Sequence, residues 1–266
     1  MAKVKGQSGL DRAQVVDAAL RLLNEVGLDG LTLRRVAQAL NVQAPALYWH
    51  VRNKQELLDE MATAMLREMD AEGGSDAGST GSTGSAGSGS ANSEDPEGGS
   101  GSAGSAGSPG SAGGDGADGS SPGESWQELL AGVGRGLRRS LLRYRDGAKV
   151  FAGTRLTDTG HAAQQEAHLR RLVAAGFSPG GAARAAFIVF VFTEGFVIEQ
   201  QAVQPVPGER APGYDTAARA DSFGSEFPLA AQAGADLFED YDSRFEEGLA
   251  AVVAGIGATL GPRPSR

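Results

Sequence analysis

Apolar residues recur at helical spacing wherever this chain shows a regular pattern. Between residues 11 and 27 the apolar positions lie three or four residues apart, which places them on one face of a helix. The same spacing recurs over residues 32–40, 45–50, 54–70, 126–144, 161–175, 180–202 and 234–258. No stretch alternates apolar and polar residues with a period of two, as a half-buried strand would. The pattern predicts an all-α fold, with the proline-containing residues 203–230 mostly in a loop.

Signals for helix ends sharpen the N-terminal part of this pattern. Asp11 and Gln14 have the spacing of a capping box at the start of the first helix. Thr32 is a favourable N-cap for the second helix, and Asn41 tolerates the left-handed conformation that a tight turn needs. Pro45 suits the first turn of a third, short helix. Two short helices joined by a tight turn predict a helix-turn-helix.

Composition divides the chain into three parts. Residues 71–123 contain 18 Gly, 14 Ser and 8 Ala among 53 residues, and no large apolar side chain. Such a segment cannot bury enough apolar surface to offset its ordering entropy, so we expect a flexible linker. The sequence therefore predicts a DNA-binding domain over residues 1–70, a linker over 71–123 and a second helical domain over 124–260.

Charge is uneven along the chain, and this changes what the net charge implies. The whole chain carries −9, but residues 1–54 hold eight Lys and Arg against four Asp and Glu. A local basic surplus on a helix-turn-helix favours contact with the phosphates of DNA. The chain has no cysteine, which excludes disulfides and thiolate chemistry. We find no signal peptide and no run of about 18 apolar residues, so we expect a soluble, cytoplasmic protein without a membrane span.

Two parts of the sequence resemble a known family. Residues 10–70, beginning LDRAQVVDAALRLLNEVGLDGLTLRRVAQALNVQAPALYWHVRNK, are similar to the DNA-binding domain of the tetracycline repressor (TetR) family. The segments GESWQELL at 123–130, LLRYRDGAKV at 141–150, GTR at 153–155 and EGFVIEQQ at 194–201 resemble the ligand-binding domain of the tetracycline-repressor class. The resemblance implies a three-helix DNA-binding domain and a C-terminal helical bundle for ligand binding and dimerisation. It also implies a homodimeric transcriptional repressor that binds a palindromic operator in double-stranded DNA and is released by a small-molecule inducer.

The second helix of a helix-turn-helix enters the major groove with its N-terminal end first. In this chain that end holds Gln43, Ala44, Pro45 and Ala46. Their small apolar groups suit thymine methyls, and Gln43 can bond a base edge. Relatives of the class have a Gln and a Thr on either side of the proline, where this chain has the two alanines. We therefore expect a different operator sequence.

Four more residues complete the predicted DNA-binding surface and its support. Arg34 is a candidate for a bidentate contact with guanine. Tyr48, His50 and Lys54 match family positions that contact the DNA backbone. We expect the adjacent Trp49 to point into the domain core instead.

The resemblance also places the inducer site, and here the chain departs from the class. The metal-binding histidine of the class corresponds to Phe151, which has no ligand atom for a cation. A second drug-contacting histidine corresponds to Asp70. Asparagine and phenylalanine contacts of the class correspond to Val133 and Leu137. These differences predict a largely apolar or aromatic inducer, such as an antibiotic or a polyketide-like compound, bound without a metal or another cofactor. The full predicted ligand-binding set is Val133, Leu137, Phe151, Thr154, Gln164, His168 and Glu199.

Several alternatives stay open from the sequence. The apolar stripe on 234–258, together with Phe187, Val191 and Ile198, predicts a dimer interface, and an intramolecular core is the alternative. Glu199 is expected to touch ligand or else to pair with Arg155 or Arg184. An enzyme is not expected, because no nucleophile and base stand at a recognisable spacing. The alternative regulator has no small-molecule inducer and signals through a protein partner.

Overall fold

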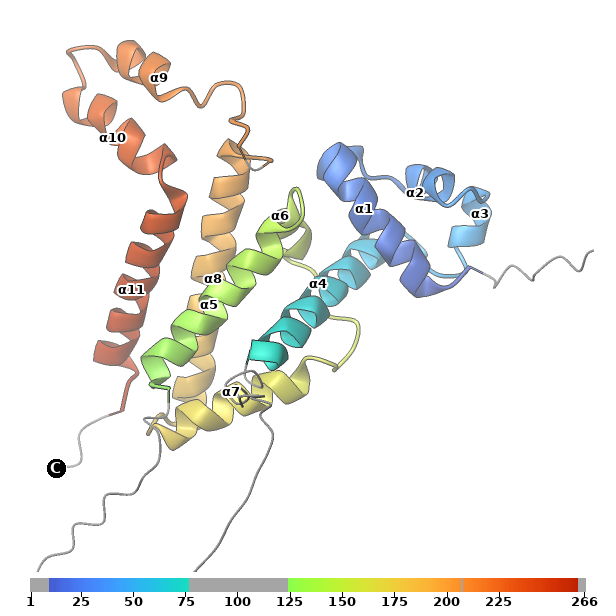
Figure 1. Ribbon diagram of the computed structural model, residues 1–266, viewed down its shortest axis with the longest axis horizontal. Helices are drawn as coiled ribbons and strands as arrows, with labels where there is room; N and C mark the ends of the chain where they lie inside the picture. Colours follow the sequence, from blue (N-terminus) through green and yellow to red (C-terminus); the bar gives the residue numbers. More distant parts are fainter. Residues whose placement is uncertain (1–9, 77–123, 207, 263–266) are drawn as a thin grey trace, which may run out of the picture.

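The computed structural model describes residues 10–76, 124–206 and 208–262, and these residues fold into eleven helices without a strand (Figure 1). The N-terminal helices are α1 (Arg12–Gly30), α2 (Leu33–Ala39), α3 (Ala44–Leu47) and α4 (Lys54–Asp76). The C-terminal helices are α5 (Trp126–Leu142), α6 (Gly147–Phe151), α7 (Ala162–Ala174), α8 (Pro179–Val203), α9 (Thr216–Phe223), α10 (Pro228–Phe238) and α11 (Tyr241–Thr259). The predicted all-α fold is confirmed.

The ends of the N-terminal helices follow their sequence signals. The Asp11 carboxylate accepts a hydrogen bond from the Gln14 backbone N–H at 2.8 Å, and the Gln14 side chain accepts one from the Asp11 N–H at 3.1 Å. The Thr32 hydroxyl accepts from the Arg35 N–H at 3.3 Å. Asn41 adopts the left-handed conformation with φ 54°, as its place in the turn requires. These contacts are local, which explains why the sequence predicts them.

Helix α4 belongs to both halves of the molecule. Its side chains Leu57, Met61 and Met65 are fully buried in one hydrophobic core. That core extends from α1, where Leu23 is buried, to α6, where Phe151 is buried. α4 contacts α1 on the DNA-binding side and α5 and α6 on the other side (Figure 1). The helix ends at Asp76 rather than near Asp70, and the rest of the expected linker lies outside the described residues.

The C-terminal helices form a bundle around α8. α8 packs against α5, α6, α7 and α11, and a second core lies where α5, α8 and α11 meet. The length and apolar composition of α8 would also allow it to cross a membrane, but in this structure α8 packs against four other helices of the bundle. α9 and α10 pack against each other and extend beyond the ends of α8 and α11 (Figure 1).

The C-terminal part follows the expected loop but departs from one expected helix. Residues 203–230 are mostly loop, as expected, although they also contain α9 and the start of α10. The helix expected over 234–258 is broken at Asp240, whose φ of 44° no helix accommodates, so α10 and α11 are separate. The apolar spacing does not reveal the break, because the apolar residues of α10 and α11 continue at helical spacing across it.

The apolar stripe of α11 is an intramolecular core. Tyr241, Phe245, Leu249, Val253 and Ile256 are all buried within the protomer. The expectation that this stripe forms a dimer interface is therefore wrong. By contrast, Phe187 on α8 keeps 65% of its surface exposed, and Val191 is also exposed. Ile198, expected in the same interface, packs partly against the first core. The outer side of α8 thus presents exposed apolar side chains.

We expect Leu249→Ala to lower the free energy of unfolding by about 2–5 kcal/mol. Leu249 is only 1% exposed, and its removal leaves a cavity in the second core. The matched control is Leu229→Ala, because Leu229 is 79% exposed. The control should change stability by less than about 0.5 kcal/mol. Urea unfolding followed by circular dichroism measures both changes, and equal midpoints for the two variants would contradict the buried position of Leu249.

Candidate DNA-binding and ligand-binding sites

The recognition helix α3 is held by its one fully buried side chain. Leu47 is inaccessible to solvent in the first core. The backbone of the turn supports it further, since the Val42 N–H donates to the Ala37 carbonyl at 3.0 Å. Gln43 is the N-cap residue and is exposed, as is Pro45. Ala44 and Ala46 remain partly accessible. The predicted base-reading residues therefore lie together at the exposed start of α3.

Trp49 does not point into the core, and that expectation is wrong. It is 89% exposed, beside the exposed Tyr48. The reason is that α3 ends at Leu47, so residues 48–50 form a turn and not a helical face. Leu47 and Val51 on either side of the turn are fully buried and already fill the core there. The turn thus presents its aromatic rings to solvent, at the end of the molecule where DNA is expected.

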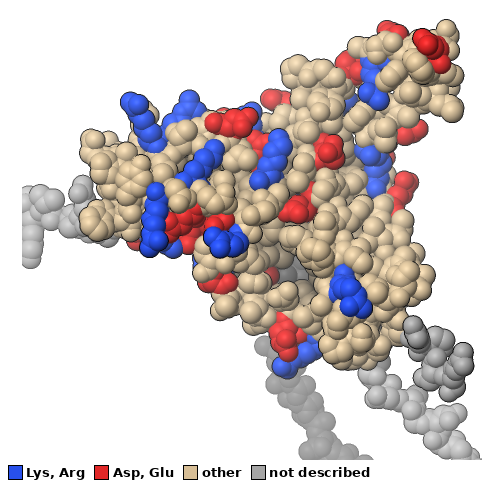
Figure 2. Space-filling model, turned by 180° about the vertical axis from the view of Figure 1, so that it is seen from behind, with Lys and Arg blue, Asp and Glu red and all other residues tan. Residues whose placement is uncertain are grey.

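Cationic side chains around α3 differ in what they already bind. Arg34 is exposed and makes no hydrogen bond or ion pair within the described residues. The guanidinium of its neighbour Arg35 instead donates to the Gly30 carbonyl at 3.1 Å. The Lys54 ammonium donates to the Leu28 carbonyl at 2.9 Å. Lys and Arg side chains lie over this end of the molecule, interspersed with acidic ones (Figure 2).

Arg12 is a positioning residue that the sequence did not reveal. Its guanidinium donates to the His50 carbonyl through Nε at 3.0 Å and Nη2 at 2.7 Å. It also forms ion pairs with Glu60 at 2.6 Å and Glu56 at 2.9 Å. Arg12 therefore ties the start of α1 to the turn after α3 and to α4. Arg12 contacts the backbone carbonyl of His50, so the His50 imidazole takes no part in this contact.

Two of the predicted ligand-binding residues share a core. Leu137 and Phe151 are both buried in the first core. The Phe151 ring lies 5.8 Å from that of Phe190 on α8, centroid to centroid. Thr154 follows closely, and its hydroxyl donates to the Phe151 carbonyl at 2.7 Å. Val133, one turn before Leu137 on α5, is partly buried. This part of the site is apolar, with one hydroxyl at its edge.

The remaining predicted ligand residues lie elsewhere in the protomer. His168 on α7 is partly buried, and burial lowers its pKa, with Arg171 lowering it further and Glu124 opposing the shift. Gln164, one turn earlier on α7, is also partly buried. Glu199 is exposed on α8 and forms no ion pair with Arg155 or Arg184. Burial raises the pKa of Tyr241 on α11, and the negative charge of the nearby Glu199 also raises it.

Glu194 is a partly buried polar group on α8 that the prediction missed. It follows Phe190 by four residues and so lies on the same side of α8. Glu194 is partly buried, and burial raises the pKa of its carboxyl. The described residues offer it no hydrogen bond or ion pair. A single acid inside an apolar run is the signal that marks it in the sequence.

The donor set does not suit a metal ion. Phe151 stands where the class has its metal-binding histidine, and its ring offers no ligand atom. Within the described residues there is no group of three or more His, Asp and Glu side chains placed to hold a metal. A cation bound beside Phe151 would therefore receive no ligand from that side chain.

The loop after α6 is joined to α4 along one stripe. The Asp59 carboxylate accepts from the Arg155 N–H at 3.1 Å, and one turn later the Thr63 hydroxyl oxygen accepts from the Thr157 N–H at 3.0 Å. A further turn along, Arg67 pairs with Asp158. Because these contacts follow directly after Thr154, the predicted ligand site is coupled to α4 by hydrogen bonds.

Asp70, at the position of a drug-contacting histidine in the class, continues the same side of α4. Burial raises the pKa of its carboxyl, and the nearby His161 opposes that shift. His161 Nδ1 is buried without a hydrogen-bond partner in the described residues. Asp70 on α4 and His161, just before α7, are thus close enough for the His161 charge to act on the Asp70 carboxyl.

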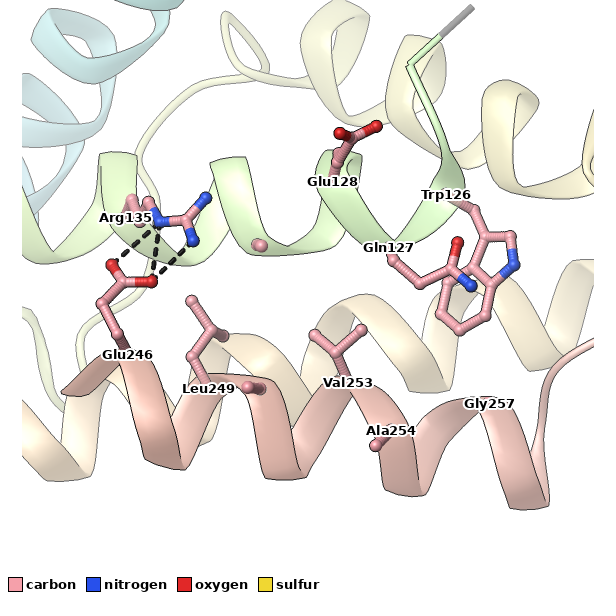
Figure 3. Close-up of a pocket in the computed structure, with 11 residues that line it drawn as sticks. Trp126, Gln127, Glu128, Arg135, Glu246, Leu249, Val253, Ala254 and Gly257 are labelled. Atoms are coloured by element: carbon pink, nitrogen blue, oxygen red, sulfur yellow. Dashed lines mark hydrogen bonds and ion pairs between the residues drawn. The ribbon is translucent and has the colours of Figure 1, made fainter. Parts of the chain in front are cut away.

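A separate groove of about 520 Å³ runs between α5 and α11 (Figure 3). Its floor includes Leu249 and Val253, and the Trp126 ring lies beside Gly257 at one end. At the other end Arg135 and Glu246 form a bidentate ion pair with N–O distances of 2.6–3.0 Å. None of the predicted ligand-binding residues lines this groove.

Comparisons with known proteins agree with this architecture. Residues 15–61 match the bacterial regulatory proteins of the tetR family, and residues 119–260 match the tetracyclin repressor-like C-terminal domain. The tetracycline repressor protein class A from transposon 1721 of Escherichia coli is 37% identical over 244 residues, which cover 91% of this chain and 88% of the relative.

Two solved structures extend the likeness to three dimensions. A possible TetR family transcriptional regulator from Streptomyces coelicolor A3(2) is 34% identical, with a TM-score of 0.65 over 93% of this chain and 99% of that chain. TetR class A in complex with 5a,6-anhydrotetracycline and magnesium is 32% identical, with a TM-score of 0.55 over 94% of this chain and 99% of that chain.

The two matched regions coincide with the helix-turn-helix of α1–α4 and with the bundle of α5–α11. The predicted family resemblance is confirmed, and so is the expectation that the protein is not an enzyme. The chain belongs to the tetracycline repressor (TetR) family and is a DNA-binding transcriptional repressor with a ligand-binding C-terminal domain.

Proposed function

We propose that this repressor binds a palindromic operator as a homodimer and is released by a small, largely apolar or aromatic inducer without a metal. The observation that carries the proposal is Phe151, a buried ring packed on Phe190 where the class has a metal ligand. An aromatic wall favours an apolar or aromatic ligand over a hydrated chelate. The repressor acts in the cytoplasm, on double-stranded DNA.

The homodimer is supported by the outer side of α8. The apolar side chains Phe187, Ile188 and Val191 are all exposed there. Contact between an apolar patch and water is unfavourable, and large exposed patches are uncommon on soluble monomers. A two-fold dimer presents two recognition helices to half-sites one helical turn apart. One helix-turn-helix alone reads too few base pairs to select an operator.

The inducer is anchored, in this proposal, by the few polar groups around the apolar site. Thr154 donates to the Phe151 carbonyl, and Glu194 lies one turn from Phe190 on α8. Gln164, His168 and Glu199 form no hydrogen bond or ion pair with Thr154 or Glu194 within the described residues, and Glu199 lies near Tyr241 on α11. We therefore assign Thr154 and Glu194 the main polar contacts.

We expect Arg34→Ala to weaken operator binding by about 1–3 kcal/mol and to relax the preference at one base pair of each half-site. The matched control is Arg35→Ala, which removes the same charge from the next residue. Because the Arg35 guanidinium already bonds the Gly30 carbonyl, its loss should leave the base preference unchanged. Selection of binding sites from random duplexes measures both. An unaltered preference in the Arg34 variant would refute its role in base reading.

The double variant Ala44→Gln, Ala46→Thr should change the sequence preference at the start of α3. Both side chains would add hydrogen-bonding groups where the wild type offers only methyls. The same selection, run with wild type and variant side by side, measures the change. Identical preferred sequences would show that the two alanines do not face the bases.

Titration calorimetry with 5a,6-anhydrotetracycline, with and without magnesium, tests the inducer site. We expect no gain in affinity from magnesium, because Phe151 supplies no ligand atom. Phe151→His restores an imidazole at that position, and a magnesium-dependent gain is expected only in this variant. Tight magnesium-dependent binding to the wild type would overturn the proposal of a metal-free site.

A further inference from the structure

The turn between α3 and α4 carries exposed aromatic side chains on a backbone that is fixed at its two ends. Tyr48 and Trp49 are exposed, whereas Leu47 and Val51 are buried in the first core. The Leu47 carbonyl accepts hydrogen bonds from the N–H groups of His50 at 2.8 Å and Val51 at 2.9 Å. The backbone hydrogen bonds of the described residues leave the His50 carbonyl unused. The rest of the turn is therefore held by side chains from other elements.

Arg12 supplies the donors for the His50 carbonyl. Its Nε at 3.0 Å and its Nη2 at 2.7 Å both donate to that one oxygen. The guanidinium is itself fixed by two carboxylates on α4, with Nη1 2.6 Å from Glu60 and Nη2 2.9 Å from Glu56. Because the guanidinium is planar and is held at three nitrogens, it cannot rotate without breaking several of these contacts. Arg12 is therefore a fixed support for the turn.

Glu56 holds the turn from its other end. Its Oε1 accepts from Arg12, and its Oε2 accepts from the Arg52 backbone N–H at 2.7 Å. The Glu56 N–H is bonded in turn to the Asn53 side-chain oxygen at 2.9 Å, which fixes the start of α4. Arg12 and Glu56 together thus bond the backbone at His50 and at Arg52. The exposed turn is joined to both α1 and α4 by this one pair of side chains.

The place of Arg12 in its own helix shows that this contact is not a by-product of helix formation. Arg12 is the first residue of α1, and the first turn of α1 contains no acidic residue. A cation there is unfavourable for the helix, because the N-terminal end of the helix dipole is positive. Glu56 and Glu60 supply the compensating negative charge. What the arginine adds at this position is the contact with the turn.

We infer that Arg12 and Glu56 are positioning residues for operator binding, which hold the turn so that Tyr48 and His50 meet the DNA backbone in one arrangement. The inference deepens the proposed function and rests on it. A turn that is already ordered loses less conformational entropy when it binds phosphate. Base reading at the start of α3 does not depend on this pair, because α3 is held by the buried Leu47.

The main test measures affinity for the duplex obtained from the binding-site selection, with every protein also carrying Glu60→Gln. In this background the loss of Arg12 leaves no buried carboxylate without its partner. We expect Arg12→Met to lower operator affinity on the order of tenfold, the scale of a lost hydrogen bond to a charged group. Affinity should also fall less steeply with salt, because fewer phosphates are contacted. The preferred base sequence should stay unchanged.

The matched control is Arg21→Met in the same background. Arg21 is an exposed residue of the same helix, so its replacement removes the same charge without touching the turn. Its operator affinity and salt dependence should stay close to those of the background protein. A loss as large as that of Arg12→Met would show that charge alone is the cause, and it would overturn the positioning role.

A double-mutant cycle tests whether Arg12 and Glu56 act together. Glu56→Gln is measured alone and combined with Arg12→Met, again in the Glu60→Gln background. If both residues act through one set of contacts, the combined variant loses little more affinity than Arg12→Met alone. Additive losses would show that the two residues act independently, and they would overturn the joint role.

A further measurement reports on the turn without DNA. The chain has two tryptophans, Trp49 in the turn and Trp126 at the start of α5, so Trp126→Phe leaves Trp49 as the only indole. Phenylalanine keeps a ring beside Phe177, which Trp126 contacts. Arg12→Met should increase the nanosecond local motion seen in the time-resolved fluorescence anisotropy of Trp49, and Arg21→Met should not. Thermal unfolding of each protein checks that the variants remain folded.

The outcomes separate this inference from the proposed function. Equal anisotropy decays with and without Arg12 overturn its role in ordering the turn, while the repressor stays intact. A more mobile turn with unchanged operator affinity overturns its role in operator binding. If Arg12→Met relaxes the base preference and also lowers the unfolding temperature, the whole domain has loosened and the positioning role is wrong. If the selection enriches no duplex even for the wild type, the proposed function fails, and the operator role of Arg12 fails with it.

Discussion

The burial of α4 in a core shared by both domains is the constraint on which the rest of the structure depends. Leu57, Met61 and Met65 have no exposed surface, so α4 cannot leave either half without opening a cavity. The DNA-binding helices and the bundle are therefore parts of one packed unit. A displacement of α4 at one end has to be accommodated at the other, since close-packed interiors transmit strain.

Hydrogen bonds connect particular segments of the bundle to α4 and to the DNA-binding helices. The loop after Thr154 bonds to a stripe of α4 through Asp59 and Thr63, while α6 bonds to the end of α1 through Asp146. Both connections begin within a few residues of Phe151. A ligand there meets an apolar wall that belongs to the same core as α4, so its binding energy acts on packing that both domains share. Coupling of this kind needs a ligand with different affinities for the two arrangements.

Phe151 places a buried aromatic ring in the predicted ligand site. The buried Phe151 ring packs on Phe190, and burial raises the pKa of the Glu194 carboxyl one turn further along α8. The groove between α5 and α11 lies on another side of the bundle and contains an ion pair already satisfied by Arg135 and Glu246. The buried Phe151 site and the surface groove are thus physically distinct.

The sequence by itself determined the features that depend on residues close together in the chain. Helical spacing gave most of the helices, and the caps at Asp11 and Thr32 and the turn at Asn41 followed from local chemistry. Residues 10–70 and four short C-terminal segments carried the resemblance to the family, which the comparisons confirm. These features are local, so no knowledge of the rest of the fold is needed to predict them.

Only the tertiary structure decided which surfaces are covered. Trp49 is exposed because Leu47 and Val51 already fill the core, and the α11 stripe is internal because α5 and α8 cover it. The same apolar spacing suits an intramolecular core or a subunit interface. An apolar helix face indicates that the face will be buried, but not whether another part of the same chain or a second subunit covers it. The contact between Asp146 and Leu28 joins residues 118 positions apart, and no local pattern marks it. The spacing of apolar residues specifies where the helices form. The packing of the helices against one another decides which of their faces are buried and which stay exposed.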